Sequence, residues 1–188
     1  MYVLGINGSP REGGNCDLLL DRALDGARSK GARIEKIVLN RLKFVACQEC
    51  ANMPDDGSCI VDDDMQKVFE KIKMADAVIL ASPIFFGSLS AQTKMMIDRF
   101  QCLWRAKYIL KNKGIEYKKK KGIFVCVEAS NRDDFFQNAR SIVKNLFATI
   151  NTDYSSELFC SGVDNKASIN THPDWLSRAY ELGVGIVS

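Results

Sequence analysis

A short loop near the N-terminus combines the residue types that bind an anion. The apolar run from Tyr2 to Ile6 is followed by residues Asn7 to Cys16, which are rich in glycine and small polar side chains, and then by a helical pattern. This order predicts a strand, a glycine-rich loop and the start of a helix. The first N–H groups of a helix have no partner within it and lie at the positive end of the helix dipole, so they stabilise a phosphate. Ser9 and Asn15 add side-chain donors, and Arg11 adds positive charge. The loop therefore predicts a phosphate site.

The glycine spacing of this loop narrows the class of ligand. The loop has neither the Gly-x-x-x-x-Gly-Lys-Ser/Thr pattern of nucleoside-triphosphate sites nor the Gly-x-Gly-x-x-Gly pattern of dinucleotide sites. A mononucleotide phosphate is the better hypothesis. The alternative is a tight turn between a strand and a helix, with Asn15 as the helix cap and no ligand.

The rest of the pattern predicts the elements that hold this loop. We expect strands near residues 2–7, 33–39, 77–81, 122–127 and 154–163, and helices over about 15–30, from 62, over 90–105, over 133–150 and after 173. The runs 77–81 and 122–127 are continuously apolar, as in central strands that are covered on both faces. This alternation favours right-handed crossovers and a doubly wound α/β fold, with one flavodoxin-like domain over residues 1–188, five parallel strands in the order 2-1-3-4-5 and three layers.

The predicted topology brings two loops together. In this strand order, ligands bind at the carboxyl ends of the first and third strands. The loop at residues 8–16 follows the first strand, and Ser82 to Ser88 follows the third. Two segments with unusual composition thus fall on the one crevice where such a sheet binds ligands.

Composition limits the class of protein. The chain has 188 residues, of which 46% are hydrophobic and 26% charged, and its formal net charge is +3. These values are ordinary for a globular protein, and the charge is too small to indicate a nucleic-acid partner. The basic segment from Lys111 to Lys121 is interpreted as a solvated loop. No apolar stretch reaches the ~18 residues of a membrane span, and the N-terminus does not resemble a signal peptide, so we expect a cytoplasmic protein without a membrane partner.

The helix predicted over residues 90–105 is apolar around more of its circumference than contact with one sheet face requires. A second buried face predicts a homo-oligomer. The alternative is an intramolecular cover by the segment from Lys111 to Lys121 or by the C-terminal helix.

Several motifs, in this order along the chain, resemble the NADPH-dependent FMN reductase family, and within it the branch that includes iron–sulfur flavoproteins. They are Gly8-Ser9-Pro10-Arg11 with Gly13-Gly14-Asn15, Asp62-Asp63-Asp64-Met65, the stretch from Ser82 to Gln92, and Lys94 with Asp98-Arg99. The resemblance covers residues 1–105 well and the rest by its order of strands and helices. It implies an enzyme that binds FMN and works as a homodimer or tetramer. Such an enzyme reduces the flavin with NAD(P)H and passes electrons to a quinone, metal, oxygen or protein acceptor.

Two other functions remain open. A flavodoxin-like or iron–sulfur flavoprotein electron carrier would not oxidise a nicotinamide itself, and a sensor of phosphate ligands would have no redox activity.

The resemblance also implies which residues border the flavin. The phosphate would be held by Ser9, Arg11, Asn15 and Cys16, and Gly14 is a further cofactor-binding residue. The isoalloxazine ring would lie against Pro83, Ile84, Phe85, Phe86 and Gly87, with Ser130 and Asn131 on a third side. No side chain is required as acid, base or nucleophile, because the cofactor carries the chemistry. Two departures from the family are Cys16, where a hydroxyl residue is common, and Phe85, where tyrosine is common.

The seven cysteines raise a separate question. Cys16, Cys102, Cys126 and Cys160 are scattered and are expected to be small buried hydrophobic residues, whereas Cys47, Cys50 and Cys59 cluster. Iron–sulfur members of the branch have a further cysteine three residues after the second of their run, where this chain has Met53.

Three interpretations of the cluster compete. The favoured one assigns no metal site, because the loop lacks a ligand for a cluster. Alternatively, three thiolates bind a cluster or zinc with a fourth ligand such as Asp55 or His172, or Cys47 and Cys50 form a redox-active pair.

Overall fold

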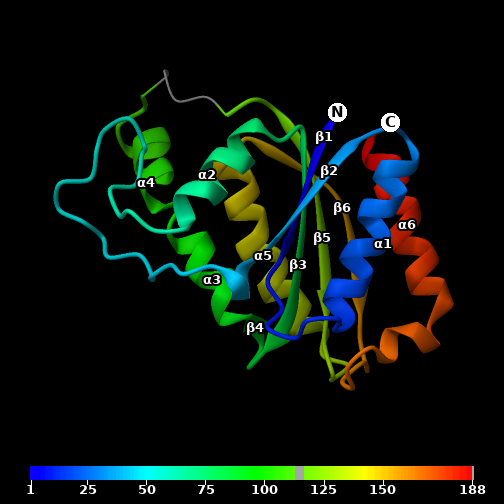
Figure 1. Ribbon diagram of the computed structural model, residues 1–188. Helices are drawn as coiled ribbons and strands as arrows, with labels where there is room; N and C mark the ends of the chain where they lie inside the picture. The colour runs from blue at the N-terminus through cyan, green and yellow to red at the C-terminus, as the bar shows by residue number, and fades with distance from the viewer. Residues whose placement is uncertain (113–116, 188) are drawn as a thin grey trace.

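Five parallel strands form the middle layer of the computed structural model, which describes residues 1–112 and 117–187 (Figure 1). The strands are β1 (Tyr2–Asn7), β2 (Arg33–Val38), β3 (Ala77–Phe85), β5 (Lys120–Val127) and β6 (Thr152–Cys160). Their order across the sheet is β2-β1-β3-β5-β6, and the short β4 (Ser88–Leu89) pairs antiparallel with the end of β3. The predicted order of the parallel strands, 2-1-3-4-5, is confirmed, with β4 as an addition.

Helices cover both faces of the sheet (Figure 1). One face carries α1 (Asn15–Ser29) and α6 (Pro173–Val187), and the other carries α2 (Met65–Met74), α3 (Ala91–Asp98), α4 (Gln101–Trp104) and α5 (Asp133–Thr149). Shorter turns are η1 (Leu39–Arg41), the π-helical η2 (Arg105–Ile109) and η3 (Ser168–Thr171). No helix in the described ranges is long and apolar enough to cross a bilayer.

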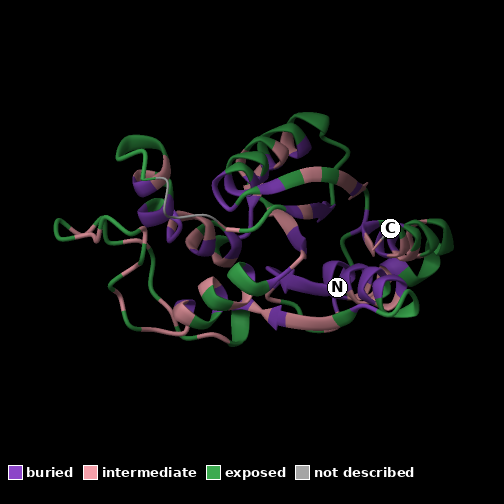
Figure 2. Cartoon of the chain, turned by 90° about the horizontal axis from the view of Figure 1, so that it is seen from above, coloured by how far each residue is buried: buried purple, intermediate pink, exposed green. Residues whose placement is uncertain are grey.

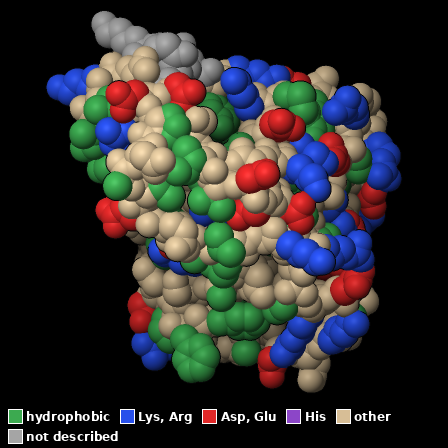
Figure 3. Space-filling model, turned by 60° about the vertical axis from the view of Figure 1, so that its left-hand side comes forward, with side chains coloured by type: hydrophobic (Ala, Val, Ile, Leu, Met, Phe, Trp, Pro, Cys, Tyr) green, Lys and Arg blue, Asp and Glu red, His purple; other side chains and the backbone are tan. Residues whose placement is uncertain are grey.

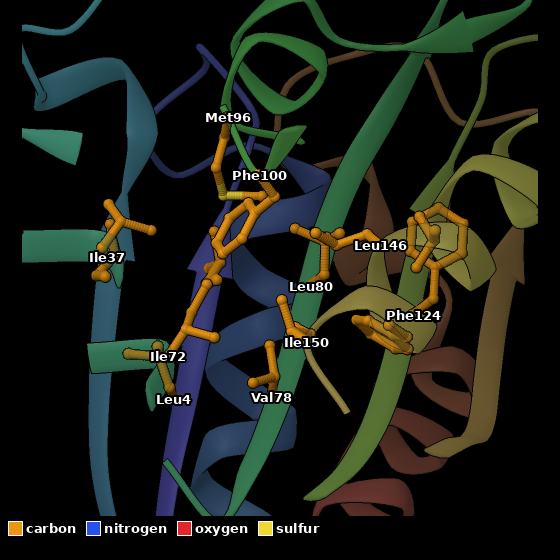
Figure 4. Packing of buried hydrophobic residues seen from close by; sticks show 14 of the residues in the cluster. Leu4, Ile37, Ile72, Val78, Leu80, Met96, Phe100, Phe124, Leu146 and Ile150 are labelled. Atoms are coloured by element: carbon orange, nitrogen blue, oxygen red, sulfur yellow. The ribbon is translucent and has the colours of Figure 1, made fainter. Parts of the chain in front are cut away.

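Each face of the sheet has its own core of buried hydrophobic residues. Figure 4 shows the core under α2 to α5, where the strand residues Leu4 and Leu80 lie with Phe100, the N-cap of α4, and Leu146 of α5. Figure 2 shows the buried residues gathered along the strands and on the helix faces that contact them, while the loop between β2 and α2 lies outside these layers. The central strands are covered on both sides, as their apolar runs predict.

Several predicted elements have other bounds in the structure: β6 spans Thr152–Cys160 rather than 154–163, and α2 begins at Met65 rather than at residue 62. Two further differences lie close to the predicted site. The third strand continues past residue 81 to Phe85, because Ser82 and Pro83 still pair with β5 and Phe85 pairs with β4. The helix predicted over 90–105 is interrupted after Asp98, and α4 continues into the π-helical turn. The interruption coincides with Arg99, whose side chain is buried against the β2–α2 loop. The spacing of apolar residues gives no indication that this arginine is buried.

The backbones of α1 and α6 touch through two glycines. A Cβ atom on Gly183 would lie 2.7 Å from the carbonyl carbon of Ala23 and overlap its oxygen, and one on Gly26 would lie 3.0 Å from the carbonyl carbon of Tyr180. Any side chain at either position would push the helices apart. These glycines therefore fix how closely α6 lies against the helix that begins at the predicted phosphate loop.

The basic segment from Lys111 to Lys121 is not all loop: residues 113–116 lie outside the described residues, and Lys120 opens β5 with 2% of its surface exposed. Its Nζ donates to the Lys118 carbonyl oxygen at 2.7 Å. Burial, together with the charge of Lys118, lowers the pKa of Lys120 to about 8.

We expect Lys120→Met to stabilise the fold by about 2 kcal/mol at pH 7, where the wild type buries a charged amine. Between pH 8 and about 10.4 the unfolded chain still holds the proton that the folded chain has released, so wild-type stability rises and the difference disappears. Urea unfolding at pH 7 and pH 10.5 measures this. Lys119→Met, at a side chain that is 74% exposed, is the control, and a Lys120→Met effect that does not change with pH would contradict the prediction.

Candidate functional site

The loop between β1 and α1 leaves the start of the helix open. Gly14 is the N-cap of α1, and no side chain caps the helix there. The Gly14 N–H donates to the Arg11 carbonyl oxygen at 3.0 Å, and a Cβ atom on Gly14 would lie 2.8 Å from that oxygen, so the fold-back needs glycine. The Asp17 carboxylate stands in the first turn, where it accepts from the Gly13 N–H at 2.8 Å and pairs with Lys36 at 2.9 Å. The first-turn N–H groups that no side chain caps lie at the positive end of the helix dipole and suit an anion.

Two predicted ligand residues of the loop stand beside this helix end. Ser9 is 5% exposed, and its Oγ accepts a hydrogen bond from the Arg11 backbone N–H at 3.2 Å, which leaves the hydroxyl proton for a ligand. The Arg11 guanidinium donates to the Asp164 carbonyl oxygen at 2.7 Å and is about half exposed. Its charge therefore lies at the rim, close to the segment that follows β6.

Asn15 makes a different contribution from the one expected. Its Nδ2 donates to the Asn165 carbonyl oxygen at 3.0 Å, and its Oδ1 accepts from the Ile169 N–H at 3.1 Å. The side chain thus ties the start of α1 to the segment before α6, and its backbone N–H, in the first helical turn, is the donor suited to a phosphate.

Cys16 is 3% exposed, and burial, with the nearby Cys160 thiol, raises the pKa of Cys16 well above its ordinary value. It is therefore a neutral thiol and a weak donor at neutral pH.

The end of β3 forms the opposite wall of the same pocket, which has a volume of about 130 Å³. The lining residues are Ser9, Arg11, Asn15, Cys16, Pro83, Ile84, Phe85, Val127, Glu128, Ala129, Val163 and Asp164. The structure therefore brings the two predicted loops together at the carboxyl ends of β1 and β3. Five further predicted residues lie one or two positions from lining residues in the chain but do not line the pocket themselves: Gly14, Phe86, Gly87, Ser130 and Asn131.

Phe86 and Gly87 form the two-residue turn between β3 and β4, with φ of 50° and 74°. Glycine adopts this conformation readily, but a phenylalanine there is strained. The Phe86 side chain is fully exposed, and that of Phe85 is 41% exposed. The turn is held by Asn138, whose Nδ2 donates to the Gly87 carbonyl oxygen at 2.8 Å. A strained, exposed aromatic side chain beside a pocket favours a role in contact with a ligand or partner.

The third wall contains residues that sequence reasoning missed. Glu128 is 3% exposed, and its carboxylate accepts from the Arg132 N–H at 2.7 Å and from the Ser130 hydroxyl at 3.1 Å. Ser130 is therefore bonded to Glu128, which orders the turn after β5. Val127, Glu128, Ala129, Val163 and Asp164 all lie where β5 and β6 end. Because ligands bind at the carboxyl ends of parallel strands, the positions after these two strands could have been predicted to line the pocket.

A network of buried hydroxyls, also missed, joins the two main loops. Ser82, Ser90 and Thr93 are fully buried. The Ser90 hydroxyl donates to the Gly8 carbonyl oxygen at 2.6 Å, and the Ser90 N–H donates to the Ser82 Oγ at 3.1 Å. A Cβ atom on Gly8 would overlap the Thr93 hydroxyl. The start of the phosphate loop is thus locked to the segment that follows β3.

We expect Ser90→Ala to lower the free energy of unfolding by about 2 kcal/mol, because the buried Gly8 carbonyl loses its donor and α3 loses its N-cap. Urea titration measures the change. Ser141→Ala, at an exposed position of α5, is the control, and equal effects of the two substitutions would contradict the prediction.

A second, narrow cavity is lined by all three cysteines of the cluster and by Cys102. It is lined by Cys47, Gln48, Glu49, Cys50, Met53, Cys59, Ile60, Val61, Arg99 and Cys102. Burial, with the Cys59 thiol nearby, raises the pKa of Cys102 to about 12. The fourth ligands considered from the sequence lie elsewhere: Asp55 pairs with Arg105 at 3.0 Å, and the His172 ring lies 4.5 Å from that of Trp175.

Comparisons with known proteins agree with the motifs. The profile of the NADPH-dependent FMN reductase family matches residues 1–151. An iron–sulfur flavoprotein of Methanosarcina thermophila is 36% identical over 113 residues, which are 60% of this chain and 59% of that protein. One of Methanocaldococcus jannaschii is 41% identical over 113 residues, which are 60% of this chain and 58% of that protein. The match thus spans about three fifths of the length of these curated relatives.

Solved structures show the same fold. An NAD(P)H:quinone oxidoreductase from Methanothermobacter marburgensis has a TM-score of 0.73 at 19% identity, over 100% of this chain and 95% of that one. An archaeal flavodoxin has a TM-score of 0.60 at 12% identity, over 100% of this chain and 96% of that one. The flavodoxin-like fold is confirmed. Because the family profile matches most of the chain, and every motif named above lies within the matched residues, the chain belongs to the NADPH-dependent FMN reductase family.

Proposed function

We propose that the chain binds FMN in the pocket between α1 and the end of β3, and that it acts as an NAD(P)H-dependent oxidoreductase. The observation that carries this proposal is the open, uncapped start of α1 facing the apolar wall of Pro83, Ile84 and Phe85 across one pocket. Family membership supports FMN as the cofactor and a reductase as the class of enzyme.

The residues of the pocket fit the two ends of FMN. The first-turn N–H groups of α1 and the Ser9 hydroxyl suit the phosphate, and Arg11 adds a charge at the rim. The residues at the end of β3 give an apolar face for a flat ring. When bound, FMN supplies hydride acceptance and electron transfer, while the chain orients it and limits access. No side chain of the pocket needs to move a proton in this scheme.

The distinguishing experiment is an absorption spectrum recorded before and after anaerobic NADPH. We expect bound flavin in the purified or FMN-supplemented protein, and bleaching by NADPH or NADH without another enzyme. Flavin that is bound but not bleached would favour an electron carrier. A protein that takes up no flavin would overturn the proposal.

Substitution of Arg11 tests the assignment of the phosphate end. We expect Arg11→Ala to weaken FMN binding about tenfold, the effect of losing one charge-assisted hydrogen bond at a partly exposed site. Binding of riboflavin, which has no phosphate, should not change. Fluorescence titration with both ligands measures this, and Arg22→Ala on the far part of α1 is the control. Equal loss for both ligands would contradict the assignment.

The proposal extends to the class of electron acceptor. A quinone, a metal, oxygen or a protein would reach the flavin at the mouth of the pocket, where Phe85 and Phe86 are exposed. Oxidation of NADPH followed with each class of acceptor in turn would rank them. The seven free thiols are typical of a reducing compartment, so we place the enzyme in the cytoplasm.

We also propose that the chain assembles as a homodimer or tetramer. Figure 3 shows hydrophobic side chains gathered in a band over the side of the molecule that carries α3 and α4. Trp104, Tyr108, Ile109 and Leu110 are between 38% and 60% exposed, on α4 and the turn after it. Light scattering at micromolar concentration should give a multiple of the chain mass, and Ile109→Asp should reduce it. A monomer mass for the unmodified protein would contradict this.

A further inference from the structure

A carboxylate stands at the start of α1, where the proposed function places the FMN phosphate. Asp17 is 7% exposed and lies in the first turn of the helix. A negative charge there repels a phosphate and competes with it for the positive end of the helix dipole. We propose that Lys36 of β2 is a positioning residue that neutralises Asp17, so that the loop at residues 8–16 can hold a dianionic phosphate. This inference rests on the proposed function and adds a residue to it.

The Asp17 carboxylate shapes the loop. Its Oδ2 accepts from the Gly13 N–H at 2.8 Å, and its Oδ1 accepts from the Asn7 Nδ2 at 2.8 Å. The Asn7 Oδ1 in turn accepts from the Ser9 N–H at 2.9 Å. Gly13 has a φ of 64°, so its bond to Asp17 holds a left-handed turn in place. Asp17 therefore connects both ends of the loop, but it also brings a negative charge next to the anion site.

Backbone donors of the loop remain for a ligand. In the part of the chain that the structure describes, no hydrogen bond uses the N–H groups of Glu12 and Asn15. Asn15 opens the first turn of α1, two residues before Asp17. A phosphate on these donors would lie close enough to Asp17 for an uncompensated carboxylate to weaken its binding.

Lys36 reaches Asp17 from the neighbouring strand. It pairs with Gly5 in the register of β1 and β2, on the face of the sheet that carries α1. Its Nζ lies 2.9 Å from the Asp17 Oδ1 and 2.6 Å from the Oδ1 of Asp21, which is about half exposed. Burial opposes the charge of Lys36, but these two bonds outweigh it and raise its pKa, so the amine is charged at neutral pH. Because the side chains of Asp17 and Lys36 are only 9% and 27% exposed, water and salt screen this pair little.

The cations on the outer side of the loop are less suited to this role. Arg11 lies 3.9 Å from Asp164, and Arg41 pairs with Glu12. These four side chains are between 53% and 75% exposed, so solvent screens their charges. Lys36 differs from them because it is mostly buried and in direct contact with the first-turn carboxylate.

Affinity for FMN and for riboflavin, measured by fluorescence titration, tests the inference. Lys36→Met should weaken FMN binding about tenfold and leave riboflavin binding unchanged, because only FMN carries the phosphate. Lys36→Arg, which keeps the charge, should bind FMN like the wild type. Adding Asp17→Asn to Lys36→Met should restore most of the lost affinity, because it removes the unpaired charge and leaves an amide oxygen as acceptor.

Lys71→Met is the matched control. Lys71 of α2 pairs with Glu35, the neighbour of Lys36 in β2, on the opposite face of the sheet. Its loss should leave the affinity for both flavins unchanged. Circular dichroism monitors folding, and Lys36→Gln replaces Lys36→Met if the latter does not fold.

Three results would overturn the inference: wild-type FMN affinity in the Lys36→Met variant, equal losses for FMN and riboflavin, or no recovery in the double variant with Asp17→Asn. All three leave FMN binding by the unmodified protein intact, so the proposed function would stand. An unmodified protein that binds no flavin would overturn the proposed function and this inference together.

Discussion

Replacing Arg99 with methionine is expected to lower the free energy of unfolding by about 3–5 kcal/mol, the cost of breaking a buried ion pair from one side. The guanidinium is fully buried and pairs with Asp63 at 2.6 Å. It also donates to the carbonyl oxygens of Val45 and Val61 at 3.0 Å and 3.3 Å. Methionine fills much of the volume but removes the cation beside the Asp63 carboxylate, which keeps only the backbone donors of Val45 and Met65, and it removes the Arg99 donor from the Val45 carbonyl. The loop between β2 and α2 would lose its main attachment to α3.

Urea unfolding measures this effect. Arg105→Met is the control, because Arg105 pairs with Asp55 at 3.0 Å while their side chains are 35% and 75% exposed. Exposed pairs contribute at most about 1 kcal/mol. The double variant Arg99→Met/Asp63→Asn should be less destabilised than the sum of its single substitutions, because the second removes the unpaired charge. Similar effects at Arg99 and Arg105 would refute the assignment.

Two glycines of α6, two residues apart, should respond to alanine with opposite signs. Gly183→Ala is expected to destabilise the fold by about 3 kcal/mol, because the new methyl group meets the backbone of α1 rather than a side chain that can rotate. Nothing lies within 4 Å of a Cβ atom on Gly185, so Gly185→Ala should stabilise the helix by about 1 kcal/mol.

Thermal and urea unfolding measure the change in stability of both variants. Each variant is the control for the other, because both replace a glycine of α6 by alanine and so change helix propensity equally. If Gly183→Ala is neutral or stabilising, the close contact between α1 and α6 does not determine stability. The flavin content of Gly183→Ala is a further readout, because α1 begins at the phosphate loop.

The fold could be predicted because hydrophobic periodicity is local. The apolar runs 77–81 and 122–127 appear as the central strands β3 and β5, and the amphipathic pattern after residue 15 appears as α1. The two loops that line the pocket followed from the strand order. The family was confirmed by comparison with known proteins.

The parts that could not be predicted depend on contacts between distant residues. Nothing around Asn15 indicates that its amide binds residues 165 and 169. The break after Asp98 coincides with the burial of Arg99 against Asp63, a carboxylate 36 residues away in the chain. Cys102 sits among apolar helix residues, and only the tertiary structure brings it to the cavity of Cys47, Cys50 and Cys59. The spacing of apolar residues predicts single helices and strands, whereas these side chains bind residues of other helices, strands and loops.

The bond between Asn15 and the segment before α6 has a consequence for how this pocket can vary among relatives. The family profile ends at residue 151, yet Val163 and Asp164 line the pocket, and Asn165 and Ile169 hold the start of α1. The phosphate loop lies inside the shared region, while the segment that clamps it lies outside. On the proposed function, we expect substitutions after residue 151 to change the affinity for FMN without altering residues 8–16 themselves.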